Sequence, residues 1–131
     1  MKAMGYLLFR LIMGVNFLFH AVNRFYYGYI GFVDWMAVEF EPTFLPTVLV
    51  RAFAFILPIA EALVGISLIL GVKTKWGLIG GTAIIAFLVL GSCLIHKWDW
   101  VGLQMVYAVC FYLLMERIEQ NTFSLDYKVV H

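Results

Sequence analysis

The segment 48–72 constrains this chain most, because it is apolar enough to cross a bilayer and yet carries a carboxylate near its middle. It has Arg51 near one end, Pro58 inside and Glu61 close to the centre. An acidic residue at the centre of a membrane helix costs about 2.5–3.5 kcal/mol on insertion scales. We therefore expect the Glu61 carboxylate to have either a partner for its charge or a function that requires it.

Composition places the whole chain in the membrane. Of the 131 residues, 64% are hydrophobic and 13% are charged, whereas a soluble domain is about half apolar and a quarter charged. Because a spanning helix needs about 20 residues, four spans and their connections use up the chain. The predicted spans are residues 3–22, 48–72, 76–95 and 98–115. Short turns make neighbouring helices antiparallel, so we predict an all-α, four-helix transmembrane bundle that forms a single domain over residues 1–131.

The long connection between the first two spans, residues 23–47, is rich in aromatic side chains. It is closed by Pro42 and Pro46. Tyr and Trp prefer the headgroup zone of a bilayer. Residues 30–40 are therefore either a short interfacial helix over the mouth of the bundle or part of an ordinary aromatic belt, and the sequence leaves both open.

Positive charges near the span ends predict the orientation of the chain. One group of basic residues falls on the side of the termini: Lys2, Lys73, Lys75, Arg117 and Lys128. A smaller group falls on the opposite side: Arg24, Arg51 and Lys97. Since cytoplasmic loops carry the excess of Lys and Arg, we expect both termini in the cytoplasm. The net charge of +1 gives no reason to expect nucleic acid as a partner.

A buried charge pair between Arg10 and Glu61 is the first prediction for the polar groups. Arg10 lies roughly 10 Å inside the first span and Glu61 roughly 16 Å inside the second, counted from the side of the termini at 1.5 Å per residue. An Arg side chain can cover that difference and offers two donors to a carboxylate. The alternative is that Arg10 reaches the headgroups while Glu61 is protonated and hydrogen-bonded.

A second set of polar residues should gather in the opposite half of the bundle. These candidate ligand-binding residues are His20, Arg51, His96 and Gln104. Together they could hold the polar head of a lipid-soluble ligand, such as the carbonyls of a quinone, or they could be interface residues with no ligand. Neither the cysteines, Cys93 and Cys110, nor any other residues form a metal or flavin motif, and no catalytic residue is assigned. Gly77 and Gly81 form a Gly-x-x-x-Gly pattern typical of close helix packing.

Two motifs of the chain resemble the helix signatures of a known family. The first-helix motif reads Arg10-x-x-x-Gly14-x-x-Phe17-x-x-His20-Ala21-x-x-Arg24. The second-helix motif reads Glu61-x-x-x-Gly65-x-x-Leu68-x-Leu70-Gly71-Val72-x-Thr74. The resemblance runs from about Leu7 to Met115. Ala21 stands where the family often has Gly, and Arg24 where it often has Lys.

The resemblance to the DoxX family implies a four-helix protein of the bacterial inner membrane. Some relatives are the small membrane subunit of thiosulfate:quinone oxidoreductase, and others are linked to oxidative-stress complexes. The first functional hypothesis is therefore a quinone-linked redox membrane subunit working beside a protein partner. The alternatives are a non-enzymatic scaffold or assembly factor for a partner protein complex, and a small transporter that uses Glu61 as a proton relay. The expected partner is either another protein subunit or further copies of this chain.

Overall fold

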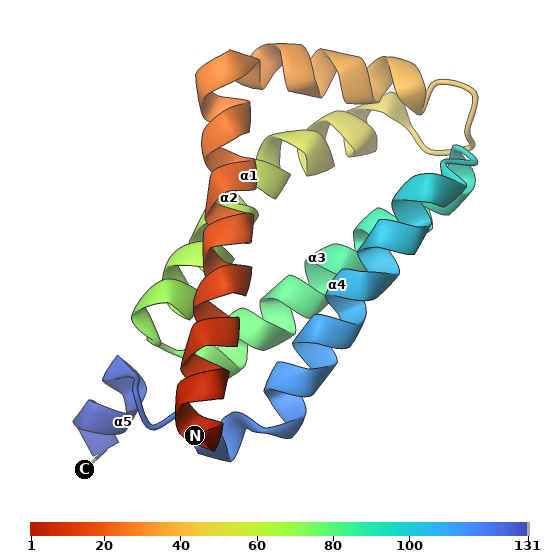
Figure 1. Ribbon diagram of the computed structural model, residues 1–131. Coiled ribbons are helices and arrows are strands. Elements are labelled where there is room, and N and C mark those ends of the chain that lie inside the picture. Colours follow the sequence, from red (N-terminus) through yellow and green to blue (C-terminus); the bar gives the residue numbers. More distant parts are fainter. Residues whose placement is uncertain (131) are drawn as a thin grey trace.

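The computed structural model describes residues 1–130 as an all-helical bundle (Figure 1). Its elements are α1 (Lys2–Glu39), α2 (Thr47–Leu70), α3 (Thr74–Leu94), α4 (Trp98–Glu116), the 3-10 turn η1 (Ile118–Gln120) and α5 (Leu125–Val130). The helices α1 to α4 are each long and apolar enough to cross a membrane, which confirms the predicted four-helix transmembrane architecture. Both termini lie at one end of the bundle, which we call the termini end.

Helix α1 is much longer than the predicted first span, and this corrects the expected connection. The helix continues to Glu39 and is bent at Gly28, whose φ of 131° and ψ of 91° are not helical. Beyond this elbow, residues 29–39 turn across the top of the bundle (Figure 1). Residues 30–39 are helical, as the first interpretation of residues 30–40 requires. The aromatic belt concerns their position in a bilayer and stays a prediction. Only residues 40–46 remain as a loop, because Pro42 and Pro46 exclude a regular helix there.

Two glycines bring α1 and α2 into close contact. A Cβ atom at Gly65 would lie 2.6 Å from the backbone nitrogen of Leu18, and one at Gly14 would lie 2.9 Å from the side chain of Ile69. The absence of these side chains allows the two backbones to approach, as small residues do in membrane bundles. The same contacts fix an antiparallel register in which Gly14 lies level with Ile69 and Leu18 with Gly65.

Helices α3 and α4 complete the bundle. The Gly-x-x-x-Gly pattern is a packing feature within the molecule: Gly77 faces Ser67 of α2, and Gly81 faces the ring of Phe111 of α4. In α4 only Phe111 and Leu114 are buried, because this helix packs mainly on α3 and barely touches α1. Part of its remaining surface lines the space between the helices, where Trp100, Gln104 and Tyr107 lie.

The segment after α4 folds back and closes the termini end. Asn121 Nδ2 donates to Thr74 Oγ1 at 3.1 Å. Both carboxylate oxygens of Asp126 accept backbone N–H groups at the start of α3, from Lys73 at 2.6 Å and Thr74 at 2.8 Å. The Asp126 N–H in turn donates to the carbonyl of Gly71 at 2.9 Å. The tail from Asn121 to Asp126 is therefore attached to the α2–α3 turn at several points.

Candidate ligand cavity

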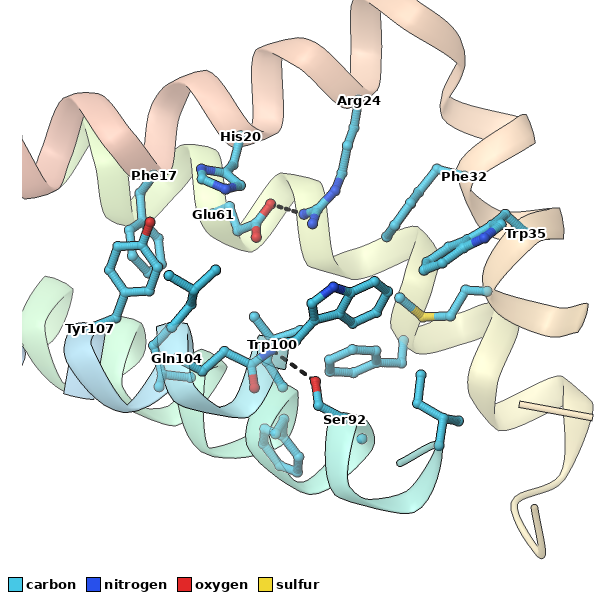
Figure 2. Close-up of a pocket in the computed structure, with 18 of the residues that line it drawn as sticks. Phe17, His20, Arg24, Phe32, Trp35, Glu61, Ser92, Trp100, Gln104 and Tyr107 are labelled. Carbon is cyan, nitrogen blue, oxygen red and sulfur yellow. Dashed lines mark hydrogen bonds and ion pairs between the residues drawn. The ribbon is translucent and has the colours of Figure 1, made fainter. Parts of the chain in front are cut away.

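A cavity of about 370 Å³ lies below the elbow of α1, between that helix and α2, α3 and α4. Figure 2 shows its walls. The polar side chains that line it are Asn16, His20, Arg24, Glu61, Ser92 and Gln104. The volume lies within the range of about 300–1,000 Å³ that is usual for small-molecule sites.

The predicted ion pair between Arg10 and Glu61 is wrong, because each of the two side chains has a different partner. Both residues are buried, at 2% and 3% exposure, but the Arg10 guanidinium donates to the Asn121 side chain and to the carbonyl of Phe123, the latter at 3.0 Å. The reason is the register of α1 on α2. When this register is extended along both helices, Arg10 lies level with the α2–α3 turn and Glu61 lies level with residue 22. The first turns of α1 extend beyond the end of α2, so counting depth from each helix end misaligned the two charges.

Glu61 forms its ion pair with Arg24 instead (Figure 2). The Glu61 side chain is 4% exposed and that of Arg24 is 22% exposed. The Arg24 guanidinium carbon also lies 4.4 Å from the centroid of the Phe32 ring, in cation–π geometry. Phe32 lies beyond the elbow, so the bend of α1 brings it back over an arginine of the same helix. The charge of Glu61 is thus compensated inside the cavity wall.

His20 lines the cavity beside Glu61, and the residue is exposed. Its Nδ1 lies 2.8 Å from the carbonyl oxygen of Asn16, one turn earlier in α1. Because a carbonyl can only accept, Nδ1 carries the proton in this contact. In the neutral ring Nε2 is then an acceptor, so His20 can take a proton or a hydrogen bond from a molecule in the cavity.

Two amide side chains in the cavity wall are hydrogen-bonded through only one of their two polar atoms. Asn16 Nδ2 donates to the Tyr107 hydroxyl at 3.0 Å, and Gln104 Nε2 donates to Ser92 Oγ at 2.9 Å. Within residues 1–130, the buried oxygens Asn16 Oδ1 and Gln104 Oε1 have no hydrogen-bond partner. A buried acceptor without a partner costs about 1–3 kcal/mol. Both side chains line the cavity, but these two oxygens have almost no accessible surface, so a molecule bound there does not reach them in this arrangement.

Aromatic rings form a large part of the apolar wall. Trp35, from the segment after the elbow, lies with its ring centroid 5.9 Å from that of Trp100 of α4 and 6.2 Å from that of Phe32. At the other side of the cavity the rings of Phe17 and Tyr107 meet edge to face, with centroids 6.5 Å apart. These flat apolar surfaces surround the polar groups, an arrangement that suits a planar ligand with polar substituents.

Two of the four predicted ligand-binding residues lie outside the cavity lining. Arg51 Nη1 donates to Asp34 Oδ1 at 2.8 Å, and both side chains are about half exposed, at 49% and 56%. His96 occupies the α3–α4 turn with a φ of 58°, and its ring lies 6.3 Å from that of Trp98. The structure therefore brings His20 and Gln104 together and leaves Arg51 and His96 at the surface.

The sequence analysis did not assign Arg24, Asn16 or Tyr107 to the site. A signal for the first two was available, since Asn16, His20 and Arg24 recur every four residues and therefore share one face of α1. Arg24 was assigned to a loop at the membrane surface because the first span was ended at residue 22. No comparable signal marks Tyr107, which becomes a site residue only through its contacts across the bundle.

The arrangement defines a class: a multi-pass membrane protein with an aromatic cavity that contains an ion pair, an imidazole and two amides with unpaired oxygens. A family model described as DoxX matches residues 5–97. The chain belongs to the DoxX family. The match includes Arg24 and Glu61, whereas Gln104 and Tyr107 on α4 lie beyond it. No curated protein and no solved structure matches the chain.

Proposed function

We propose that the protein binds the head of a membrane quinone in this cavity and acts as the quinone-binding membrane subunit of an oxidoreductase. The single observation that supports this most is the combination, in one cavity, of aromatic rings with the Arg24–Glu61 ion pair and the His20 imidazole. A quinone head is planar and apolar apart from two carbonyls, and its tail is soluble in lipid. It matches both parts of the wall.

The residues of the chain have distinct roles in this proposal. The rings of Trp35 and Trp100 hold the flat face of the head group, and the Arg24 guanidinium and the His20 imidazole orient its oxygens. Reduction of a quinone consumes two electrons and two protons. Glu61 and His20 are the cavity groups able to exchange protons, with Arg24 compensating the charge of Glu61.

The electrons come from a partner protein in this proposal. Among residues 1–130, no group of three His, Cys, Asp or Glu side chains could hold a metal ion. The sparsely buried helix α4 offers a long outer surface for a partner within the membrane. A scaffold or assembly factor would use the same surface without the cavity, and it remains the second candidate on that observation.

The two histidines supply a matched test, because His20 lines the cavity and His96 does not. The protein is purified from bacterial membranes, and bound quinone is quantified by mass spectrometry for wild type, His20→Asn and His96→Asn. Asparagine suits both sites, since it tolerates the left-handed backbone of residue 96. We expect quinone with wild type and His96→Asn and a reduced content with His20→Asn. Absence of quinone from wild type, together with a stoichiometric protein partner, would refute quinone binding and favour the scaffold.

A further inference from the structure

Helix α4 meets α1 at two levels beside the cavity, and the two chains are apart between these levels. Toward the termini end, Asn16 Nδ2 donates to the Tyr107 hydroxyl at 3.0 Å, and the ring of Phe17 lies edge to face with that of Tyr107. At the elbow end, the rings of Trp35 and Trp100 lie with their centroids 5.9 Å apart. Between the two levels α1 and α4 diverge (Figure 1). We call the space between these contacts the α1–α4 window.

Two side chains of the cavity wall face this window. His20 lies four residues after Asn16 in α1, and Leu103 lies four residues before Tyr107 in α4. Because residues four apart share one face of a helix, both side chains project toward the other helix, one turn nearer the elbow than the Asn16–Tyr107 hydrogen bond. Both line the cavity and both are exposed. The cavity is therefore open to the outside at their level.

The window opens on lipid when the bundle is in a bilayer. Its α4 edge, from Trp100 to Tyr107, covers about two turns of a helix that is long and apolar enough to cross a membrane. The exposed side chains that adjoin the window are apolar, such as Phe19 beside His20 and Val106 one turn after Leu103. A hydrocarbon chain can therefore pass from the cavity into the bilayer without crossing water.

The α2–α3 side of the cavity is more closed. Phe87 of α3 is also an exposed residue of the cavity lining. Its ring, however, lies beside that of Phe53 of α2, with the centroids 6.1 Å apart. An aromatic contact thus bridges α2 and α3 on that side, whereas His20 and Leu103 leave the α1–α4 side open.

We propose that the α1–α4 window is the passage through which a hydrocarbon chain of the bound ligand leaves the cavity, with Leu103 packed against that chain. The inference rests on the proposed quinone-binding function. It adds that the ligand carries a tail, that it enters from the lipid, and that Leu103 contributes to the preference for tailed over tail-free quinones. The head group lies inward of the window, beside the rings of Trp35 and Trp100.

Photolabelling of wild type traces the chain directly. The probe is a benzoquinone with a short isoprenoid tail that carries a diazirine close to the ring. Wild type in phosphatidylcholine nanodiscs is irradiated with the probe, with and without excess tailed quinone that lacks the diazirine, and labelled residues are identified by mass spectrometry. We expect competed labelling within residues 19–23 and 102–106. A diazirine fatty acid is the control, and its labelling of lipid-facing residues should not be competed.

A pair of tryptophan variants on α4 tests the role of Leu103. Leu103→Trp fills the window and should weaken binding of the tailed quinone by about tenfold, the lower part of the usual range for a side chain too large for its site. The same head group with a methyl in place of the tail should bind as it does to wild type. Val106→Trp is the matched control, because Val106 is 60% exposed, close to the 64% of Leu103, but lies outside the cavity lining. Calorimetric titration in nanodiscs measures the affinities.

Each outcome decides between the alternatives. Competed labelling at Phe53 or Phe87 would place the chain between α2 and α3, and the absence of competed labelling would mean that the bundle does not hold the chain. Equal effects of Leu103→Trp on the tailed and tail-free ligands would remove the role of Leu103. All three results overturn the inference and leave quinone binding intact. If wild type binds neither ligand, the proposed function itself fails. Thermal unfolding verifies that the variants are folded, and the labelling does not depend on them.

Discussion

Glu61 forms a buried ion pair with Arg24. Loss of the partner should affect the two side chains differently. The Glu61 side chain is 4% exposed, whereas that of Arg24 is 22% exposed and also contacts Phe32. Removing the arginine therefore leaves an uncompensated carboxylate in low dielectric. Removing the carboxylate leaves an arginine that can turn toward the membrane surface.

Arg24→Met should destabilise the protein more than the double variant Arg24→Met/Glu61→Leu. Breaking a buried pair costs about 3–5 kcal/mol in soluble proteins, while replacing both partners with apolar groups can be near neutral. Water defects and side-chain reorientation make the penalty smaller in a membrane. The measurement is thermal unfolding in detergent of wild type, both single variants and the double variant. Additive losses would contradict the pair seen in the structure.

A surface ion pair provides the matched control for that experiment. Arg51 and Asp34 are bonded at 2.8 Å but are about half exposed. Exposed pairs contribute about 0–1 kcal/mol, because solvent screens them. Arg51→Met should therefore lower the unfolding temperature much less than Arg24→Met. Equal losses would mean that burial does not set the energy of the Arg24–Glu61 pair.

At the scale of single elements, α1 is the helix whose shape the sequence did not predict. The four apolar runs were long enough to identify every span, and Pro42 and Pro46 marked the true loop. Polar and aromatic residues after residue 22 indicated the end of a span, but they do not end a helix, since neither disrupts the backbone hydrogen bonds. Apolarity predicts where a chain leaves the bilayer, whereas helix continuation depends on residues such as proline.

The elbow depends on glycine at position 28, and a second glycine three residues later supplies the comparison. A Cβ would meet nothing within 4 Å at Gly28 or Gly31, but only Gly28 has a positive φ. Gly28→Ala should cost about 1–3 kcal/mol from backbone strain. Gly31→Ala should instead stabilise its helical segment by roughly 0.5–1 kcal/mol. Opposite shifts of the unfolding temperature are expected, and a stabilising Gly28→Ala would argue for an unbent α1.

The short helix α5 is attached by one carboxylate, and this makes its docking sensitive to acid. Burial alone would raise the pKa of Asp126, but hydrogen bonds from Thr74 and from the backbone of Lys73, with the charge of Arg10, outweigh it and hold that pKa below its ordinary value of 3.8. A lowered pKa in the folded state stabilises the docked form above the ordinary pKa. The stabilisation is lost as the pH falls through the lowered value.

Docking of α5 should therefore weaken below about pH 3.8 in wild type. A spin label on Val129→Cys, in a Cys93→Ser/Cys110→Ser background, reports the mobility of the tail. We expect the label to become more mobile as the pH falls below about 3.8, and to be mobile at higher pH as well in Asp126→Asn. Asp99→Asn, at the start of α4, is the control and should leave the transition unchanged. A transition that persists in Asp126→Asn would assign it to another group.

At the scale of the whole molecule, the sequence predicted which charged residues are buried at a cost in free energy, but not which residues they contact. Apolar burial and the 3.6-residue period identify buried charges such as Arg10 and Glu61 individually. Their partners depend on the register of α1 against α2, which is set by the contacts at Gly14 and Gly65. The tail that binds Arg10 lies more than a hundred residues away in sequence, and no local pattern links them.

The structure also sharpens the prediction of orientation in the membrane. Arg24 was counted among the positive charges opposite the termini, but its side chain points into the cavity and is paired with Glu61. The opposite side then retains only Arg51 and Lys97 of the basic residues counted there. The termini end keeps its group: Lys2, Lys73, Lys75, Arg117 and Lys128. Because Lys and Arg near span ends are retained in the cytoplasm, the stronger bias favours cytoplasmic termini.

Reporter fusions test this orientation directly. A fluorescent protein that matures only in the cytoplasm should fluoresce at either terminus, and alkaline phosphatase inserted between His96 and Lys97 should be active, because that turn lies at the other end of the bundle. Lys2→Gln/Lys75→Gln removes two of the charges at the termini end and leaves the cavity intact. If charge sets the orientation, this variant should give a mixed population with reduced phosphatase activity. Active phosphatase at a terminus of wild type would show that the bundle is inserted the other way, with the cavity end facing the cytoplasm.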